Sequence, residues 1–290
     1  AARISGASPA RTVFTITLPM MWPSIVAAAL LVFVAAGSCY GIPSIIGAPG
    51  KIYTVTTRII DYVYIGSQQG LTDATELAVF LMAIALAVLY VSNIALGRKQ
   101  YITVSGKSTR PNTVDLGGWR IPFTILVSLF AIIIVAIPFV TVFATSFTVD
   151  MGNPLGAGNL TTKYWRVIMS RKSILESAGN SLKSALLAAT FGMIISCSMA
   201  YLLKRTEVRG KSIPDFLITV GSGTPSIVIA LSLIMTMSGR FGINIYNSLA
   251  ILIIAYMIKY MLMGMRTTVS AFSQISPSLE EAAQISGAKW

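Results

Sequence analysis

The polar segment Ser278-Leu279-Glu280-Glu281-Ala282-Ala283-Gln284-Ile285-Ser286-Gly287-Ala288 follows a long apolar chain. Residues 1–7 match residues 282–288 at six of seven positions, and only Arg3 against Gln284 differs. The two copies are 281 residues apart, from Ala1 to Ala282. A repeat determines how a fold is interpreted, because repeated segments form repeated structures. Short runs of small residues also match by chance, so the rest of the chain must show whether these two segments are a true repeat.

The local chemistry of this segment predicts a short helix that ends in a turn. Ser278 and Glu281 have the spacing of a capping box, and Gly287 tolerates the left-handed conformation that ends many helices. In the N-terminal copy, Ser8 and Pro9 predict the start of a second helix, which Pro19 should break. Each copy should therefore be a short helix, a glycine turn and another short helix.

The composition is that of a membrane protein. Hydrophobic residues make up 54% of the 290 residues, charged residues 11%, and the mean hydropathy is +0.75. Soluble domains carry roughly 25% charged residues. We expect an all-α polytopic protein, because a bilayer-spanning helix needs about 20 mostly apolar residues. Six stretches meet that length: 22–40, 75–96, 121–143, 181–203, 213–237 and 248–265.

Basic residues predict the orientation, because loops rich in Lys and Arg stay in the cytoplasm. With a cytoplasmic N-terminus, thirteen basic residues fall inside and seven outside. The short loop 204–212 has four basic residues in nine. The net charge of +12 is thus explained mainly by the orientation of the chain in the membrane, and nucleic acid is not an expected partner. Both copies of the terminal segment, and both ends of the sequence, then face the cytoplasm.

Several chemistries lack the residues that they need. The chain has no His, and Cys39 and Cys197 lie far apart in apolar runs, so we expect no metal site, no cofactor and no catalytic residues. Gly106-Lys107-Ser108 resembles the end of a phosphate-binding loop, but that loop would need Gly at the position of Tyr101, so it is not one. Lys259 is the one ionisable residue well inside a predicted span. It either snorkels to the inner interface or pairs with a neighbour, or it faces a pathway.

Residues 280–288 resemble the Glu-Ala-Ala…Gly signature of the permease subunits of binding-protein-dependent (type I) ABC importers. The N-terminal copy supplies the downstream part of this signature, through Gly6 to Leu18 and Pro19. Other stretches are similar to the ferric-iron branch, although less specifically: 41–47, the connector 106–120, 180–182 and 223–228.

The resemblance implies a type I importer permease fold in a bacterial cell membrane, with no enzymatic activity of its own. Its partners would be a cytoplasmic dimer of ATP-binding subunits and an extracytoplasmic substrate-binding protein. The implied ATPase-coupling residues are Glu280, Glu281, Ala282, Ala283, Gly287, Ala1, Ala2 and Gly6. The candidate pathway residues are Ser222, Thr224, Pro225, Ser226 and Lys259, since a proline inside a span frees backbone groups that can line a cavity.

Two copies of the signature imply a fused permease. We expect residues 1–97 to end a first half with two spans, 98–120 to form a cytoplasmic connector, and 121–290 to begin a second half with four spans. The sequence would be a fragment of a parent chain of about 560 residues, twice the offset of the repeat. The sequence says least about the transported substrate. Ferric iron is the first expectation, and thiamine, polyamine, phosphonate or sulfate are alternatives. An ion-coupled secondary transporter and a membrane scaffold are the alternatives of other classes.

Overall fold

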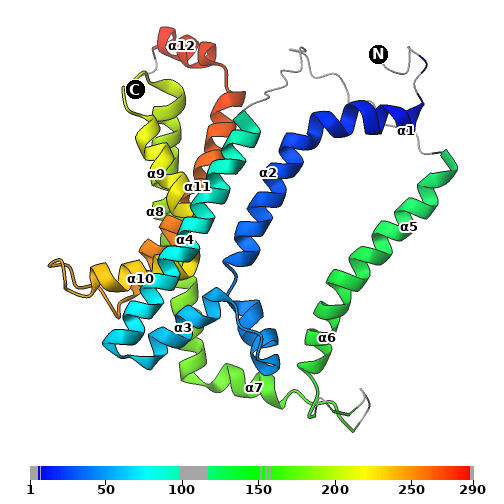
Figure 1. Ribbon diagram of the computed structural model, residues 1–290, viewed down its shortest axis with the longest axis vertical. Helices are drawn as coiled ribbons and strands as arrows, with labels where there is room; N and C mark the ends of the chain where they lie inside the picture. Colours follow the sequence, from blue (N-terminus) through cyan, green and yellow to red (C-terminus); the bar gives the residue numbers. More distant parts are fainter. Residues whose placement is uncertain are drawn as a thin grey trace. The chain divides into compact units, whose positions relative to one another are not determined.

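The computed structural model describes residues 6, 8–97, 117–150, 152–153, 156 and 158–287. The chain divides into two compact units: unit 1 combines Ala1–Ile102 with Lys183–Trp290, and unit 2 is Thr103–Leu182. Among the described residues every regular secondary-structure element is a helix, and β-structure is limited to two isolated bridges. The expected all-α class is therefore confirmed (Figure 1).

Unit 1 holds most of the long helices. In chain order its elements are α1 (Pro9–Thr12), η1 (Val13–Thr17), α2 (Leu18–Gly37), η2 (Pro43–Gly47), η3 (Ala48–Gly50), α3 (Val55–Ile65), α4 (Gln68–Gly97), α9 (Ser212–Gly223), α10 (Ser226–Met237), α11 (Leu249–Gln274) and α12 (Pro277–Ile285). Unit 2 contains η4 (Gly117–Trp119), α5 (Arg120–Ala131), η5 (Ile132–Ala136), α6 (Ile137–Thr145) and α7 (Lys163–Ser170). Helix α8 (Lys172–Arg205) begins in unit 2 and continues into unit 1.

Five helices of the described chain are long and apolar enough to cross a membrane, and a sixth span is formed if one bent helix pair counts as one. The prediction of six spans is confirmed with this qualification. The predicted span 213–237 is broken at the proline singled out in the sequence. It consists of α9 and α10 with a bend of 108° between them, because Pro225 cannot donate to the helix and disfavours helical geometry at Thr224.

Small residues on α4 let its neighbours approach closely. Ala74, Ala78 and Ala85 recur every four to seven residues and are nearly completely buried, so they share one face of the helix. Ala74 and Ala78 belong to the main buried cluster of unit 1, whose other members are Ile59 of α3, Leu81 of α4, and Val228 and Leu231 of α10. This packing fixes α10 against α4 after the break.

A second close contact joins α8 and α11. Five small residues of α8 are buried at four-residue intervals: Ser184, Ala188, Gly192, Ser196 and Ala200. Ser196 Oγ donates to the carbonyl oxygen of Met261 at 3.2 Å. A Cβ on Gly264 would lie 2.9 Å from Met193 Sδ and 3.0 Å from Ser196 Oγ, so only glycine fits there without displacement. Small residues that allow backbones to approach are typical of helix pairs in membranes.

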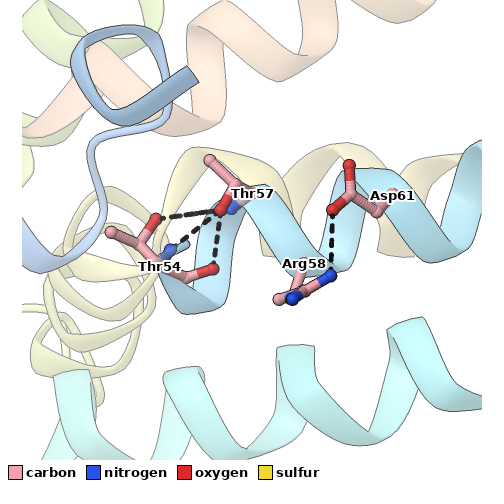
Figure 2. A network of polar contacts seen from close by, with 4 residues as sticks. All are labelled: Thr54, Thr57, Arg58 and Asp61. Carbon is pink, nitrogen blue, oxygen red and sulfur yellow. Dashed lines mark hydrogen bonds and ion pairs between the residues drawn. The ribbon is translucent and has the colours of Figure 1, made fainter. Parts of the chain in front are cut away.

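Helix α3 lies between two predicted spans, in a stretch for which the sequence predicts only an outer loop. Thr54 caps its start through a reciprocal arrangement with Thr57, and Arg58 forms an ion pair with Asp61 at 3.7 Å (Figure 2). Thr56 Oγ1 donates to the carbonyl oxygen of Cys39 at 2.9 Å. This bond ties the start of α3 to the segment that follows α2.

Two π-helical turns directly precede prolines. Leu18 N–H donates to Val13 O before Pro19, and Ile137 N–H donates to Ile132 O before Pro138. Widened turns of this kind accommodate the proline ring and the missing donor. The predicted break at Pro19 is therefore wrong: the helix runs from Pro9 to Gly37 through η1 without interruption.

Unit 2 contains a span with little internal packing. In the stretch Gly117–Thr145 none of the apolar window is buried. After it, Asn159 closes the following loop by donating from Nδ2 to the carbonyl oxygens of Asp150 and Asn153. Trp165 of α7 stacks on Phe147 with ring centroids 5.7 Å apart. Helix α7 thereby packs against the residues that follow α6.

Candidate functional site

The break between α9 and α10 is the centre of the candidate site. Helix α9 ends at Gly223, Thr224 and Pro225 adopt extended conformations, and α10 begins at Ser226. The side chains of Thr224 and Pro225 are buried. Thr224 Oγ1 donates back to Val220 O at 2.8 Å, which occupies this hydroxyl within α9. A broken helix exposes carbonyl groups at one new end and N–H groups at the other.

Lys259 of α11 binds the carbonyl end of this break. Its Nζ donates to Ser222 O at 3.1 Å and to Thr224 O at 2.9 Å. A cation at a helix C-terminus is stabilised by the partial negative charge of the unpaired carbonyls. Of the alternatives expected for Lys259, these two bonds correspond to pairing with a neighbouring group.

Ser222 connects the same two helices through its side chain. Its Oγ donates to Ile258 O at 3.2 Å and accepts from Leu262 N at 3.3 Å. Gly221 and Gly223 allow this approach, since a Cβ on Gly221 would lie 3.3 Å from Ile258 Cγ2 and one on Gly223 would overlap Leu89 Cδ1. Backbone and side-chain bonds together hold the broken span against α11.

A cavity of about 590 Å³ opens beside the break. Three of the five predicted pathway residues line it, namely Ser222, Ser226 and Lys259. Thr224 and Pro225 do not line the cavity and instead shape the break behind it. The cavity also has a wall that sequence reasoning missed, formed by the end of α2 and the residues after it: Leu31, Val34, Ala35, Ser38, Cys39 and Tyr40. No motif in that wall distinguishes it from an ordinary helix end.

The predicted coupling segment lies at one end of the unit 1 helices. Helix α12 follows α11 after a short turn, and α1 lies toward the same end (Figure 1). Gly287 ends the segment with a φ of +89°, and Gly6 in the other copy has a φ of +82°. The glycine turn predicted for both copies is confirmed. Ala1 and Ala2 lie outside the described residues, as do the side chains of Glu280 and Ala283; Glu281 and Ala282 are exposed on α12.

The start of α12 differs from the predicted capping box. The helix begins at Pro277, so Ser276 precedes it and Ser278 already lies in the first turn. Ser278 Oγ contacts Ser276 Oγ at 2.7 Å. The Ser-Pro pair at 276–277 is the stronger start signal, because proline is favoured at the first helical position. A different Ser-Pro pair, after the glycine turn of the N-terminal copy, behaves as expected: Ser8 Oγ accepts from Arg11 N at 3.3 Å at the start of α1.

Arg205 fixes the junction between α11 and α12. Its Nη2 donates to Ile275 O at 2.8 Å and to Phe272 O at 3.4 Å, and its guanidinium lies over the Phe272 ring at 5.7 Å. Tyr201 packs edge-on against the same ring. In the sequence, Arg205 contributes only to the count of basic residues that predicts the orientation of the chain in the membrane. Its contacts were missed because the partners lie about 70 residues away.

The fold and the site define a polytopic helical membrane protein with a cavity at a discontinuous span. A family model described as "Binding-protein-dependent transport system inner membrane component" matches residues 1–99 and 190–290. The chain belongs to this family. The resemblance drawn from the terminal segment is confirmed at this level.

Individual relatives are more distant. FbpB 1 of Haemophilus influenzae, a ferric transport system permease by its name, is 28% identical over 97% of this chain and 44% of its own length. The ferric transport system permease protein FbpB of Actinobacillus pleuropneumoniae is 27% identical over 94% of this chain and 39% of its own length. The spermidine/putrescine transport system permease protein PotC of Escherichia coli K12 is 36% identical over 26% of this chain and 28% of its own length. The chain spans less than half the length of these ferric permeases.

Proposed function

We propose that the chain is part of the permease of an ATP-driven importer that moves ferric iron delivered by an extracytoplasmic binding protein. The observation that carries the coupling role is the pair of left-handed glycines, Gly6 and Gly287, 281 residues apart in matching segments. Each would position a short helix against one ATP-binding subunit. The coupling residues are Glu280, Glu281, Ala282, Ala283 and Gly287, with Ala1, Ala2 and Gly6 in the other copy.

The proposed parts follow the repeat. Residues 1–97 end a first permease half, 98–120 form a cytoplasmic connector, and 121–290 begin a second half. Support comes from the two separate stretches of the family match, 1–99 and 190–290. The end of unit 1 that carries α12 would face the cytoplasm, because Lys204 and Arg205 end α8 there and basic residues favour the cytoplasmic side.

In this proposal the permease does no covalent chemistry. Closure of the ATP-binding dimer moves the coupling helices, and the spans change from inward-facing to outward-facing because the nucleotide binds one state more tightly. Ferric iron is favoured by the FbpB relatives, which match nearly all of the chain. A polyamine is the second candidate, favoured by the PotC match over a quarter of the chain.

The test uses the full-length permease, its ATP-binding subunit and the binding protein encoded beside it, reconstituted in proteoliposomes. Uptake of radioactive iron should require ATP and should be unaffected by ionophores. Uptake of spermidine in place of iron would replace the substrate while keeping the mechanism. Uptake that continues without ATP and stops when ionophores collapse the ion gradient would identify a secondary transporter instead. A Gly287→Ala variant that still co-purified with the ATP-binding subunit while losing transport would contradict the docking role.

A further inference from the structure

The described residues that line the cavity beside the broken span carry positive charge only. Lys259 is the one charged residue among those that line it, and none of its described lining residues is acidic. The other polar side chains that line the cavity are uncharged hydroxyls, including those of Ser38, Tyr40 and Ser226. A charge buried in a span is costly and usually marks a functional site. The sign of this charge therefore says which ligands the cavity accepts.

The helix ends at the break do not remove the positive charge. The carbonyl end of α9 faces Lys259 and carries roughly half a negative charge, while the first turn of α10, with Ser226 and Ile227, lines the cavity and carries roughly half a positive charge. These two partial charges have opposite signs, and neither is as large as the full charge of the ammonium. What remains is the ammonium of Lys259, whose third N–H is not used by the two carbonyl bonds.

The size of the cavity also favours a molecule over a bare ion. About 590 Å³ is in the range of small-molecule sites. The walls combine apolar side chains from α2 and α4 with donors from the break, which is the composition that holds an anionic group by hydrogen bonds. A bare trivalent cation would meet a like charge and, among the described lining residues, no carboxylate.

We propose that the cavity at the α9–α10 break binds a small anion of carboxylate or phosphate chemistry, and that a metal ion crosses it as an anionic chelate. The second half of this statement rests on the proposed function in metal import; the first half does not. Lys259 is the electrostatic determinant, and Ser226 with the first turn of α10 supplies neutral donors.

A purely structural role for Lys259 makes a different prediction. If Lys259 only caps α9, the position of its charge matters and a lysine elsewhere on the wall cannot replace it. Ala230 of α10 lines the same cavity, but its side chain starts from a different wall. Moving the lysine from 259 to 230 keeps the charge of the cavity and removes the bonds to Ser222 O and Thr224 O.

The experiment measures equilibrium binding of radioactive citrate, phosphate and ferric citrate to the purified full-length transporter in detergent, without ATP and without binding protein. Wild type should bind at least one of these anions, and Lys259→Met should bind it about tenfold more weakly or worse, the equivalent of one charge-assisted hydrogen bond. The double variant Lys259→Met/Ala230→Lys should recover most of the affinity. Ala230→Lys alone should bind the anion more tightly than wild type, which gives a readout even if Lys259→Met folds poorly.

Three results would overturn the proposal: no anion binding by wild type, equal binding by Lys259→Met, or a loss in Lys259→Met that the double variant does not restore. Binding of citrate but not of phosphate would assign carboxylate chemistry to the ligand, and the reverse would assign phosphate chemistry. Loss of iron uptake in the reconstituted system with anion binding intact would remove the proposed import function and leave the anion site in place.

Discussion

Arg205 Nη2 lies 2.8 Å from the carbonyl oxygen of Ile275, the residue after the last turn of α11. This bond joins the C-terminal end of α8 to the short turn that leads into α12. The guanidinium also covers the Phe272 ring. The direction of α12 is thus set by a residue of another span as well as by its own turn.

The Arg205 contact predicts a specific defect in coupling. Arg205→Gln removes hydrogen bonds from a charged donor, worth about 1.5–3 kcal/mol, so α12 should be less well positioned. We expect a several-fold lower stimulation of ATPase activity by the loaded binding protein in the reconstituted transporter. Lys204→Gln is the matched control, because it removes the same charge from the neighbouring, exposed position. Equal losses in both variants would show that the charge of this end matters and the Ile275 bond does not.

The conformation of Gly287 predicts an ordered response to substitution. Its φ is +89° and no atom lies within 4 Å of the position that a Cβ would take, so the effect of a side chain comes from the backbone alone. Gly287→Ala should cost about 1–2 kcal/mol and weaken co-purification of the ATP-binding subunit. Gly287→Asn should weaken it less, because Asn adopts the left-handed region more readily.

A glycine without this conformation serves as the control. Gly179 of α8 also has open space around its Cβ position, and its φ is not positive. Gly179→Ala should leave co-purification unchanged, since alanine favours a helix. A Gly287→Ala variant that behaves like Gly179→Ala would contradict the turn as a requirement for docking.

Gly223 and Leu89 should be energetically coupled. A Cβ on Gly223 would overlap Leu89 Cδ1, and overpacking of this kind costs about 1–3 kcal/mol. Gly223→Ala should lower the melting temperature in detergent, and Leu89→Ala should lower it by leaving a gap. The double variant should be more stable than the sum of the two losses predicts. Strict additivity would mean that Leu89 moves aside without cost.

The α8–α11 contact predicts a contrast between two glycines. Gly264→Val places its Cβ within 3.0 Å of both Met193 Sδ and Ser196 Oγ, so these side chains must shift, and the two methyl groups of Val add to the crowding. We expect a loss of about 1–3 kcal/mol in stability. Gly192→Ala should be tolerated, because its nearest neighbour is Met257 Cγ at 3.9 Å. Thermal unfolding in detergent compares the two, and similar melting temperatures would contradict the close approach.

Hydropathy predicted the spans well because each span must satisfy its backbone internally in lipid. The same reasoning predicted 213–237 as one span, and Pro225 was recognised as a proline inside it. The size of the bend, 108°, follows neither from hydropathy nor from the presence of the proline. Helix α3 was also readable, since Thr54 with Thr57 caps its start and Gly66 ends it with a φ of +68°. With 11 residues, α3 is too short to cross a bilayer, so hydropathy does not predict it.

The contacts of the candidate site could not be read from the sequence. Lys259 was identified as the unusual ionisable residue, but its partners Ser222 O and Thr224 O are backbone atoms about 35 residues away. Arg205 likewise binds carbonyl groups, which carry no sequence signal. Side-chain patterns predict local helix starts and ends, whereas long-range bonds to backbone depend on how helices pack.

The described parts of the two copies lie on opposite sides of the glycine turn. Helix α12 precedes Gly287 and joins α11 through a turn that Arg205 holds from α8, whereas α1 follows Gly6 and continues into α2 through the π-turn Val13–Thr17. If a whole copy contains both connections, a push on it would reach the preceding span as rotation of a rigid lever and the following span as bending of a joint.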